Sequence, residues 1–379
     1  FLNIDPGNTA DVVSLYTNKI LEEAKVSAQS VVVEINKWRQ NNMAALQKAA
    51  AAVNAGADYL GVALLEEAVA LREGNVPGPI LAWLNTSNDR FAECIARDID
   101  LSVNSVATLK AISNAAYSVD RIARIHIKVD TGLNRNGVTL TDLPELILAL
   151  RKAEDEGTVK VVGVMSHFAY ADEPSNSTIA DQIAEFKTAV DLLEVANFEL
   201  EVKHLANSAA TLALPDTYFN MVRPGVAAYG ISPGEEVGTA TDFDLKPVMT
   251  LCAPIALLKK VPAGSGVSYA HQYHTSTDTT LALIPAGYAD GVPRSATNVG
   301  PVLVGGEIRK IAGRVCMDQF VLDVGDMDVH LGDEVVLFGD PERGEPSVED
   351  WAAAAGTISY EIITRIGPRV HREFINNSW

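Results

Sequence analysis

HLANSAATLALPDTYFNMVRPGVAAYG, residues 204–230, contains two short apolar runs that each end in a turn of small residues. The first turn offers Asn207 and Ser208, and the second offers Arg223 and Gly225. Small side chains let a ligand approach the backbone closely, and N–H groups at the start of a helix point toward an anion. Two such turns in succession predict a phosphate site, and the Arg223 guanidinium adds a permanent positive charge beside it.

The chain before this stretch repeats one unit, a short apolar run followed by a helical pattern. The expected helices are Asp11–Val26, 41–54, Leu64–Arg72, Asp89–Ala96, Ser105–Tyr117, Leu143–Glu156 and Thr178–Val195. The expected strands are Val31–Ile35, Tyr59–Ala63, Pro79–Leu84, Asp100–Val103, Ala123–Val129, Val159–Met165, Leu200–Leu205 and Phe219–Val222. Continuous apolar runs indicate strands covered on both faces, hence parallel strands.

Eight such units predict an α/β fold, a TIM (β/α)8 barrel, and a doubly wound open sheet is the alternative. In TIM barrels phosphate binds in the loops after strands seven and eight, which here are the two turns of residues 204–230.

After about residue 240 the pattern changes to short strands separated by Gly, Asp and Pro turns. The expected strands are Val248–Val261, Thr280–Pro285, Val302–Val304, Glu307–Ile311, Gln319–Val324 and Glu334–Phe338. One helical stretch, Val348–Ile363, is broken near Gly356. We therefore predict a barrel over residues 1–240 and a mostly β C-terminal domain over residues 241–379.

Composition excludes several classes of function. The formal net charge of −19 argues against nucleic acid or an anionic membrane as a partner. No apolar run reaches the roughly 18 residues that span a bilayer, and no secretory signal is recognised. The three cysteines, Cys94, Cys252 and Cys316, are too far apart to predict a disulfide or a metal site. This usage fits a cytoplasmic protein.

Polar and basic residues gather where the expected barrel strands end. They are Lys128, Arg135, Ser166, His167, His204, Ser208 and Arg223. Any one of them could be structural, but together they predict a site for a small anionic ligand. In the β domain, Tyr269 lies in a glycine-rich turn, where a tyrosine is more often a surface or interface residue than a catalytic one.

Seven motifs, in order, closely resemble those of alanine racemases, particularly the actinobacterial type. The resemblance runs from about Gly56 to Arg372. The motifs are KVDTGLNRNG (128–137), SHFAYAD (166–172), HLANS (204–208), VRPG (222–225), GVSY (266–269), PAGYADG (285–291) and GRVCMDQ (313–319).

The resemblance implies a pyridoxal phosphate enzyme that interconverts L-alanine and D-alanine for peptidoglycan synthesis. It implies a homodimer whose active sites use both chains, with a first β-domain strand that can come from the N-terminus. The residues implied to hold the phosphate are Ser208, Gly225, Val226 and Tyr360. Arg223 would face the pyridine nitrogen, His167 would lie against the ring, and Arg135 would contact the phenolic oxygen and the substrate.

Other roles implied by the resemblance fall largely in the β domain. Tyr269, from the other chain, would be one catalytic base, and Met317 would bind substrate through its backbone. The residues implied to line the substrate corridor are Tyr288, Arg294 and Arg314. Lys128 matches a lysine that is often carbamylated in the family and orients Arg135. Racemisation needs two bases on opposite faces of the cofactor, a lysine and a tyrosine.

The lysine that bonds to the cofactor is where the sequence departs from the family. Counting back without a gap from Ala55–Asp58 places it at Lys37, directly after a strand-like run, but Asn41 stands at the family's tyrosine position. Lys37 is therefore either the catalytic lysine or an ordinary surface lysine. Three alternatives stay open: a catalytically impaired homologue, an amino-acid decarboxylase, and a racemase for serine or another amino acid.

Overall fold

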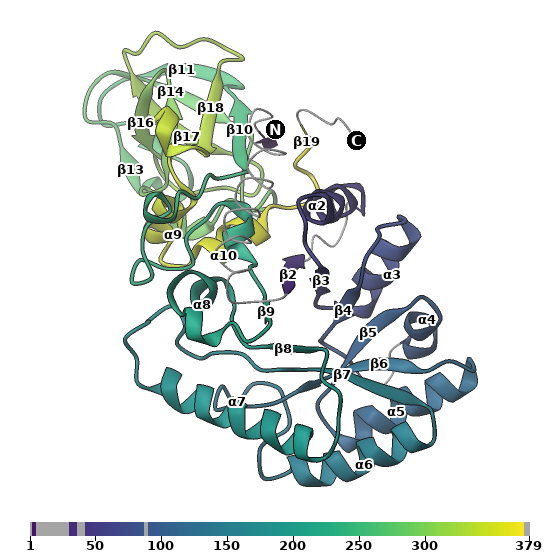
Figure 1. The fold of residues 1–379 in the computed structure, drawn as a ribbon. Coiled ribbons are helices and arrows are strands. Elements are labelled where there is room, and N and C mark those ends of the chain that lie inside the picture. The colour runs from purple at the N-terminus through teal and green to yellow at the C-terminus, as the bar shows by residue number, and fades with distance from the viewer. Residues whose placement is uncertain (1, 5–29, 36–41, 87–89, 375–379) are drawn as a thin grey trace.

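The structure is a computed structural model that describes residues 2–4, 30–35, 42–86 and 90–374. These residues form two domains, and each domain has its own buried apolar core. Figure 1 shows the barrel strands with their helices in one part and the β domain in the other.

Eight parallel strands form a closed barrel. They are β2 (Ser30–Ile35), β3 (Tyr59–Val62), β4 (Ile80–Ala82), β5 (Ile99–Val103), β6 (Ala123–Lys128), β7 (Val159–Met165), β8 (Val202–His204) and β9 (Met221–Val222). The last strand closes on the first, because Met221 pairs with Ser30 and Val222 with Val31. The predicted barrel is confirmed, and the open-sheet alternative is wrong.

Helices follow the strands and cover the barrel. They are α2 (Asn42–Asn54), α3 (Leu65–Glu73), α4 (Phe91–Ala96), α5 (Val106–Ser118), α6 (Leu143–Asp155), α7 (Thr178–Val195) and α8 (Ser208–Ala213). In α6, Leu143, Leu146 and Leu150 are buried, a helical spacing that turns one apolar stripe toward the strands. The predicted helix Asp11–Val26 lies outside the described residues.

Within the described residues, the β domain contains three sheets. The largest has the order β16 (Glu307–Lys310), β15 (Pro301–Val304), β18 (Glu334–Phe338), β10 (Thr250–Pro254), β1 (Leu2–Ile4) and β19 (Arg372–Phe374). The others are β11 (Leu257–Val261), β14 (Thr279–Ile284) and β17 (Phe320–Gly325), and the pair β12 (Gly266–Val267) and β13 (Tyr273–His274). Trp351, on α9 (Val348–Ala355), is fully buried in the core of this domain.

The prediction of one continuous strand over Val248–Val261 is wrong. This segment divides into β10 and β11, which belong to different sheets. Between them the Ile255 N–H donates to Asp333 O at 2.8 Å and the Ala256 N–H donates to Leu283 O at 2.9 Å. The expected helix break is confirmed, since α9 ends at Ala355 and is followed by Gly356, in the left-handed region at φ +69°, before α10 (Ser359–Arg365).

The N-terminal strand β1 lies in the β domain, between β10 and β19. Leu2 pairs with Leu251 on one side and with Arg372 on the other. The sequence predicted that residues 2–4 belong to the barrel, as part of residues 1–240, but in the structure they pair with strands of the β domain. We propose a division near residue 240 in which β1 counts with the β domain.

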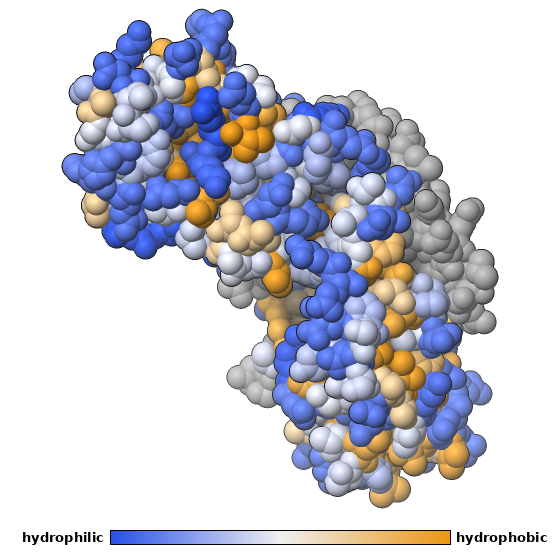
Figure 2. All heavy atoms as spheres, turned by 90° about the vertical axis from the view of Figure 1, so that its left-hand side faces the viewer, coloured by the Kyte–Doolittle hydropathy of each residue, from blue (hydrophilic) through white to orange (hydrophobic). Residues whose placement is uncertain are grey.

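The loops after β8 and β9 face the β domain. Val226 and Tyr229, on the short helix η2 (Val226–Tyr229), belong to the same buried cluster as Ile362 of α10. Figure 2 shows the resulting shape, two lobes joined by a narrower region. The carboxyl ends of the last two barrel strands therefore lie beside the joint between the domains.

Candidate active site

The two turns of residues 204–230 meet at one hydroxyl group. Ser208 Oγ accepts hydrogen bonds from the Gly225 N–H at 2.7 Å and the Ala227 N–H at 3.4 Å. Ser208 is the first residue of α8, and Asn207 caps that helix by accepting the Ala210 N–H at 3.0 Å. One small buried region therefore contains a hydroxyl group and several backbone donors.

Arg223 fixes the loops after three neighbouring strands. Its side chain is only 2% exposed. NH1 donates to His204 O at 2.8 Å, and NH2 donates to Ser166 O at 2.8 Å and to Leu205 O at 3.1 Å. A guanidinium has donors and no acceptor, so these carbonyl groups suit it. The cation is thereby held rigidly at the carboxyl end of the barrel.

His167 lies beside this guanidinium, with Nδ1 3.4 Å from NH2 of Arg223. Burial, and then the positive charges of Arg223, Lys128 and Arg135, hold its pKa well below the usual 6.5. The ring is therefore neutral at physiological pH. Gln182 of α7 holds the backbone here, since its Nε2 donates to His167 O at 3.2 Å.

Stability should depend on pH through two buried histidines. Burial, followed by the charge of Arg223, also lowers the pKa of His204 well below 6.5. A lowered folded pKa means that the stabilisation is complete above about pH 6.5 and is lost as the pH falls toward the folded pKa values. We expect the free energy of unfolding to fall below pH 6.5 by at most about 2.7 kcal/mol per pH unit, about 1.4 for each histidine.

Urea unfolding at pH 7.5, 6.5 and 5.5 measures this slope. His330→Gln is the control, because His330 is exposed and its substitution leaves both of these histidines in place. Asp100 and Glu201, whose pKa values are lowered, act at more acidic pH, and Lys48, whose pKa burial lowers to about 7, contributes mainly above pH 7. The interval from pH 6.5 to 5.5 therefore reports the two histidines. An equal free energy of unfolding at pH 7.5 and 5.5 would contradict the prediction.

Lys128 and Arg135 flank a loop that folds back onto the end of β6. The Val138 N–H donates to Lys128 O at 2.8 Å, and the Asp130 N–H donates to Val138 O at 2.9 Å. Gly137 makes the close return possible, because its φ is +130° and a Cβ there would collide with the backbone of residues 129–130. Arg135 is exposed on this loop, and its charge reaches His167.

Tyr360 joins this barrel group from the β domain. It lies on α10 and packs against the buried cluster that contains Val226. Tyr360 therefore packs against the same apolar core as Val226, the residue that follows Gly225.

The remaining predicted residues form a second group on the β domain. Ser268 Oγ donates to Arg314 O at 2.7 Å, which attaches the Tyr269 turn to the loop between β16 and β17. The Tyr288 N–H donates to Cys316 O at 3.0 Å, beside Met317. The Tyr269 side chain is 69% exposed and that of Met317 is 53% exposed. Arg294 is also exposed, at the start of a short helix.

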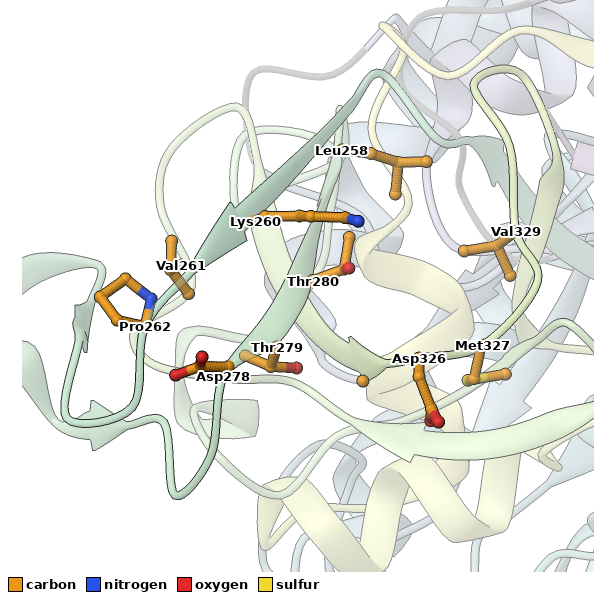
Figure 3. Close-up of a pocket in the computed structure, with 11 residues that line it drawn as sticks. Leu258, Lys260, Val261, Pro262, Asp278, Thr279, Thr280, Asp326, Met327 and Val329 are labelled. Atoms are coloured by element: carbon orange, nitrogen blue, oxygen red, sulfur yellow. The ribbon is translucent and has the colours of Figure 1, made fainter.

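One predicted residue and one pocket are not part of the arrangement described above. Lys37 lies outside the described residues, so its place relative to Arg223 is not described. A separate hollow in the β domain, shown in Figure 3, is lined by Lys260, Asp278 and Asp326 among others and by none of the predicted site residues.

Sequence reasoning missed three buried polar residues, two on barrel strands and one on α7. Asp100, His126 and Gln182 are all buried. Asp100 and His126 interrupt apolar strands, in IDLSV and ARIHIK, and such an interruption is the signal that could have identified them. Gln182 stands on a helix with no comparable signal.

Comparison with known proteins assigns the chain to a family. A family model described as "Alanine racemase, N-terminal domain" matches residues 18–233, and "Alanine racemase, C-terminal domain" matches residues 248–374. The chain belongs to the alanine racemase family. Such racemases are isomerases that depend on pyridoxal phosphate, and this protein is an enzyme of that class.

Individual relatives agree with the family match. Alanine racemase of Frankia casuarinae is 54% identical over 327 residues, which cover 86% of this chain and 85% of that protein. That of Streptomyces coelicolor is 47% identical over 373 residues, 97% of this chain and 95% of that one. The crystal structure of alanine racemase from Streptomyces lavendulae superposes with a TM-score of 0.93 at 47% identity, covering 98% and 95% of the two chains.

The residues present fit pyridoxal phosphate. The hydroxyl of Ser208 and the N–H groups of Gly225 and Ala227 converge where a phosphate could bind, and Gly225 has no side chain to obstruct it. Arg223 lies in the same loop as Gly225, directly after β9, and the neutral ring of His167 follows β7, beside that guanidinium. Among residues 2–4, 30–35, 42–86 and 90–374, no three His, Cys, Asp or Glu side chains are placed to hold a metal ion. Within the same residues, no helix is long and apolar enough to span a membrane.

Proposed function

We propose that the protein interconverts L-alanine and D-alanine at the carboxyl end of its barrel. The observation that supports this most is the buried Arg223 guanidinium, held by three carbonyl groups beside the Ser208–Gly225 contact. Ser208, Gly225, Val226 and Tyr360 would hold the cofactor phosphate. Arg223 would face the ring nitrogen, His167 would lie against the ring, and Arg135 would contact the phenolic oxygen and the substrate.

The chain's own residues would divide the chemistry in a simple way. When bound, pyridoxal phosphate supplies the electron sink that lets the Cα–H bond of alanine break. Lys37 and Tyr269 would each hold or remove the Cα proton on one face of the substrate. Arg223 can only donate a hydrogen bond, so it would keep the ring nitrogen unprotonated and disfavour side reactions. Met317 would bind the substrate through its backbone.

Further assignments belong to the same proposal. Tyr288, Arg294 and Arg314 would line the substrate corridor, and Lys128 would orient Arg135, in a carbamylated form. A cytoplasmic location, with D-alanine used for peptidoglycan, is part of the same proposal, and the three widely spaced cysteines of the sequence fit that location. The family match gives no support to an impaired homologue or a decarboxylase.

We propose a homodimer in which each active site combines the barrel group of one chain with the β-domain group of the other. The exposure of Tyr269 and Met317 supports this, because side chains that act on a substrate need an enclosed site. In such a dimer Lys37 and Tyr269 of one site come from different chains.

Mixing two inactive variants tests these roles together. Lys37→Ala and Tyr269→Phe chains should each form inactive homodimers. In a purified heterodimer one site keeps both bases and the other loses both, so we expect about half of the wild-type racemase rate. The measurement is D-alanine formation by heterodimers isolated with two different affinity tags.

Borohydride reduction of the cofactor-loaded enzyme, followed by digestion and mass spectrometry, is the matching control. The cofactor should be found on Lys37 in wild type and on no peptide of Lys37→Ala. Verified heterodimers without activity would rule out shared sites. Cofactor on a different lysine would overturn the assignment of Lys37 and leave the shared site to be tested with that lysine.

A further inference from the structure

A line of hydrogen bonds crosses the barrel interior and ends at Arg223. His126 Nε2 lies 3.2 Å from Asp100 Oδ2, and His126 Nδ1 lies 3.0 Å from His204 Nε2. His204 Nδ1 in turn lies 3.2 Å from NH1 of Arg223. The four side chains come from β5, β6, β8 and the residue after β9, and all are buried.

Only one arrangement of protons satisfies every link. The Arg223 guanidinium can only donate, so His204 Nδ1 accepts and His204 carries its proton on Nε2. That proton is donated to His126 Nδ1, which leaves the His126 proton on Nε2, directed at Asp100. A second proton on His126 would reverse the middle bond and set an N–H of His204 against an N–H of Arg223.

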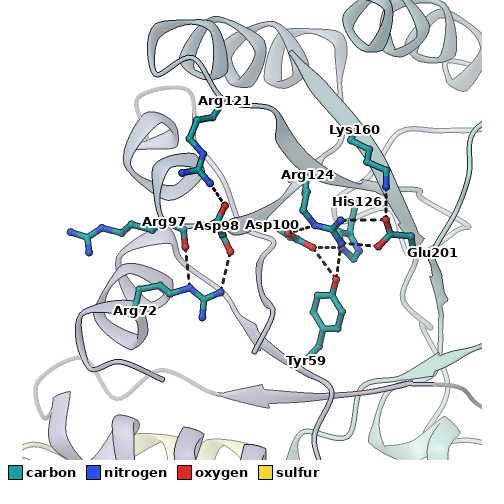
Figure 4. Close-up of polar contacts among 10 residues, drawn as sticks. All are labelled: Tyr59, Arg72, Arg97, Asp98, Asp100, Arg121, Arg124, His126, Lys160 and Glu201. Carbon is teal, nitrogen blue, oxygen red and sulfur yellow. Dashed lines mark hydrogen bonds and ion pairs between the residues drawn. The ribbon is translucent and has the colours of Figure 1, made fainter. Parts of the chain in front are cut away.

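The far end of the line is a firmly held carboxylate. Asp100 Oδ2 also accepts the Tyr59 hydroxyl at 3.0 Å, and Oδ1 accepts Arg124 Nε at 3.1 Å (Figure 4). Burial alone would raise the pKa of Asp100, but the hydrogen bond from His126 and the charge of Arg124 outweigh it and lower that pKa. Arg124 itself pairs with Glu201 at 2.8 Å near the surface. The line thus runs from a carboxylate that is fixed by Arg124 and Tyr59 to the Arg223 guanidinium.

The barrel wall is shaped to admit this line. The pairing of β6 with β7 shifts register between Ile125 and His126, so that Gly163 stands opposite His126. A Cβ at Gly163 would collide with the His126 ring. Such irregularities re-aim side chains near functional sites. Barrel interiors are usually filled by Val, Ile and Leu, and burying Asp and His there instead costs stability.

We propose that Asp100, His126 and His204 form a positioning relay, here called the barrel relay, that orients the guanidinium of Arg223 toward the cofactor ring nitrogen. This inference rests on the proposed role of Arg223. The relay residues act through Arg223 and do not touch the substrate. Its physical basis is that a neutral His204 with Nδ1 unprotonated is the acceptor that NH1 requires, and that the fixed carboxylate selects this tautomer through His126.

Nitrogen-15 NMR of the histidine-labelled full chain tests the proton arrangement directly. The protein has seven histidines, so their signals can be assigned by single His→Gln variants. His126 and His204 should each show a protonated Nε2 and an unprotonated Nδ1 near neutral pH, with and without pyridoxal phosphate. A doubly protonated His126, or a proton on Nδ1 of His204, would overturn the relay.

Asp100→Asn tests whether the relay acts on the cofactor. An amide must direct an N–H toward His126 or toward Arg124, so it disrupts the arrangement without changing side-chain size. We expect kcat to fall about 10- to 100-fold with KM for alanine nearly unchanged, as for a misoriented group. The absorption spectrum of the bound cofactor and the His204 tautomer should change together.

Tyr59→Phe is the matched control, because it removes one hydrogen bond to Asp100 and leaves the carboxylate and its bond to His126. It should retain the wild-type tautomers and kcat. The wild-type protein could show the expected tautomers while Asp100→Asn keeps the wild-type kcat and cofactor spectrum. That result would overturn the positioning role. Wild-type holoenzyme that fails to racemise alanine would count against the proposed function, and the histidine signals would still decide the relay.

Discussion

Tyr269→Phe is expected to lower kcat for racemisation by about 10²- to 10⁴-fold while pyridoxal phosphate stays bound. The change removes only the hydroxyl that would hold or accept the Cα proton. Tyr269 is largely exposed in the single chain, so no core packing is lost. The turn that presents it is fixed by Ser268, whose hydroxyl bonds to Arg314 O and is untouched by the substitution.

Deuterium exchange at Cα, followed separately for L-alanine and D-alanine, gives the sharper measurement. Exchange from the face served by Tyr269 should be lost, and exchange from the face served by Lys37 should be retained much better. Tyr273→Phe is the control, since Tyr273 is nearby but donates its hydroxyl to Asp323 at 2.8 Å. Equal loss for both enantiomers together with loss of cofactor would refute the role of Tyr269 as a base.

Arg223→Met is expected to lower the free energy of unfolding of the cofactor-free protein by about 3–5 kcal/mol. The substitution removes the guanidinium donors from the carbonyls of Ser166, His204 and Leu205, of which His204 O keeps the Ser166 N–H at 3.3 Å. It also removes the donor at one end of the barrel relay, while Asp100 keeps its ion pair with Arg124. Buried acceptors without partners are costly because water cannot reach them.

Arg72→Met is a matched control for this stability change. The Arg72 guanidinium also donates to three backbone carbonyls, those of Val76, Arg97 and Asp98, at 3.0–3.1 Å. That site lies near the surface, where water can replace the lost donors. We therefore expect Arg72→Met to lower the free energy of unfolding by only about 1–2 kcal/mol. Urea unfolding of both variants without cofactor measures the difference. A loss for Arg223→Met no larger than that for Arg72→Met would contradict the prediction.

Most of the fold could be predicted because its signals are local. Continuous apolar runs identified all eight barrel strands, and both α7 and β18 have the predicted bounds. The division of residues 248–261 could not be predicted, since β10 and β11 separate only because they pair with strands of different sheets. The short strand β19 likewise exists through its pairing with β1.

The residues of the candidate site could likewise be predicted only where their signals are local. Small residues and fixed cations at strand ends identified Ser208, Arg223 and His167, because those features lie within short segments. Asp100 and His126 were missed, since only closure of the barrel brings them into line with His204. The relay is therefore a property of the closed barrel rather than of any one motif.

The position of β1 has a consequence for how the chain folds. Within the described residues, β19 pairs only with β1, and β1 reaches β10 only after the whole barrel segment has been synthesised. During translation the segment at Leu2–Ile4 must wait until Thr250 and Leu251 have emerged from the ribosome. Such long-range pairing is slow and forms late. In the sequence, the whole barrel lies between β1 and β10, which are neighbouring strands of one sheet. This sheet can therefore be completed only after both domains have been synthesised.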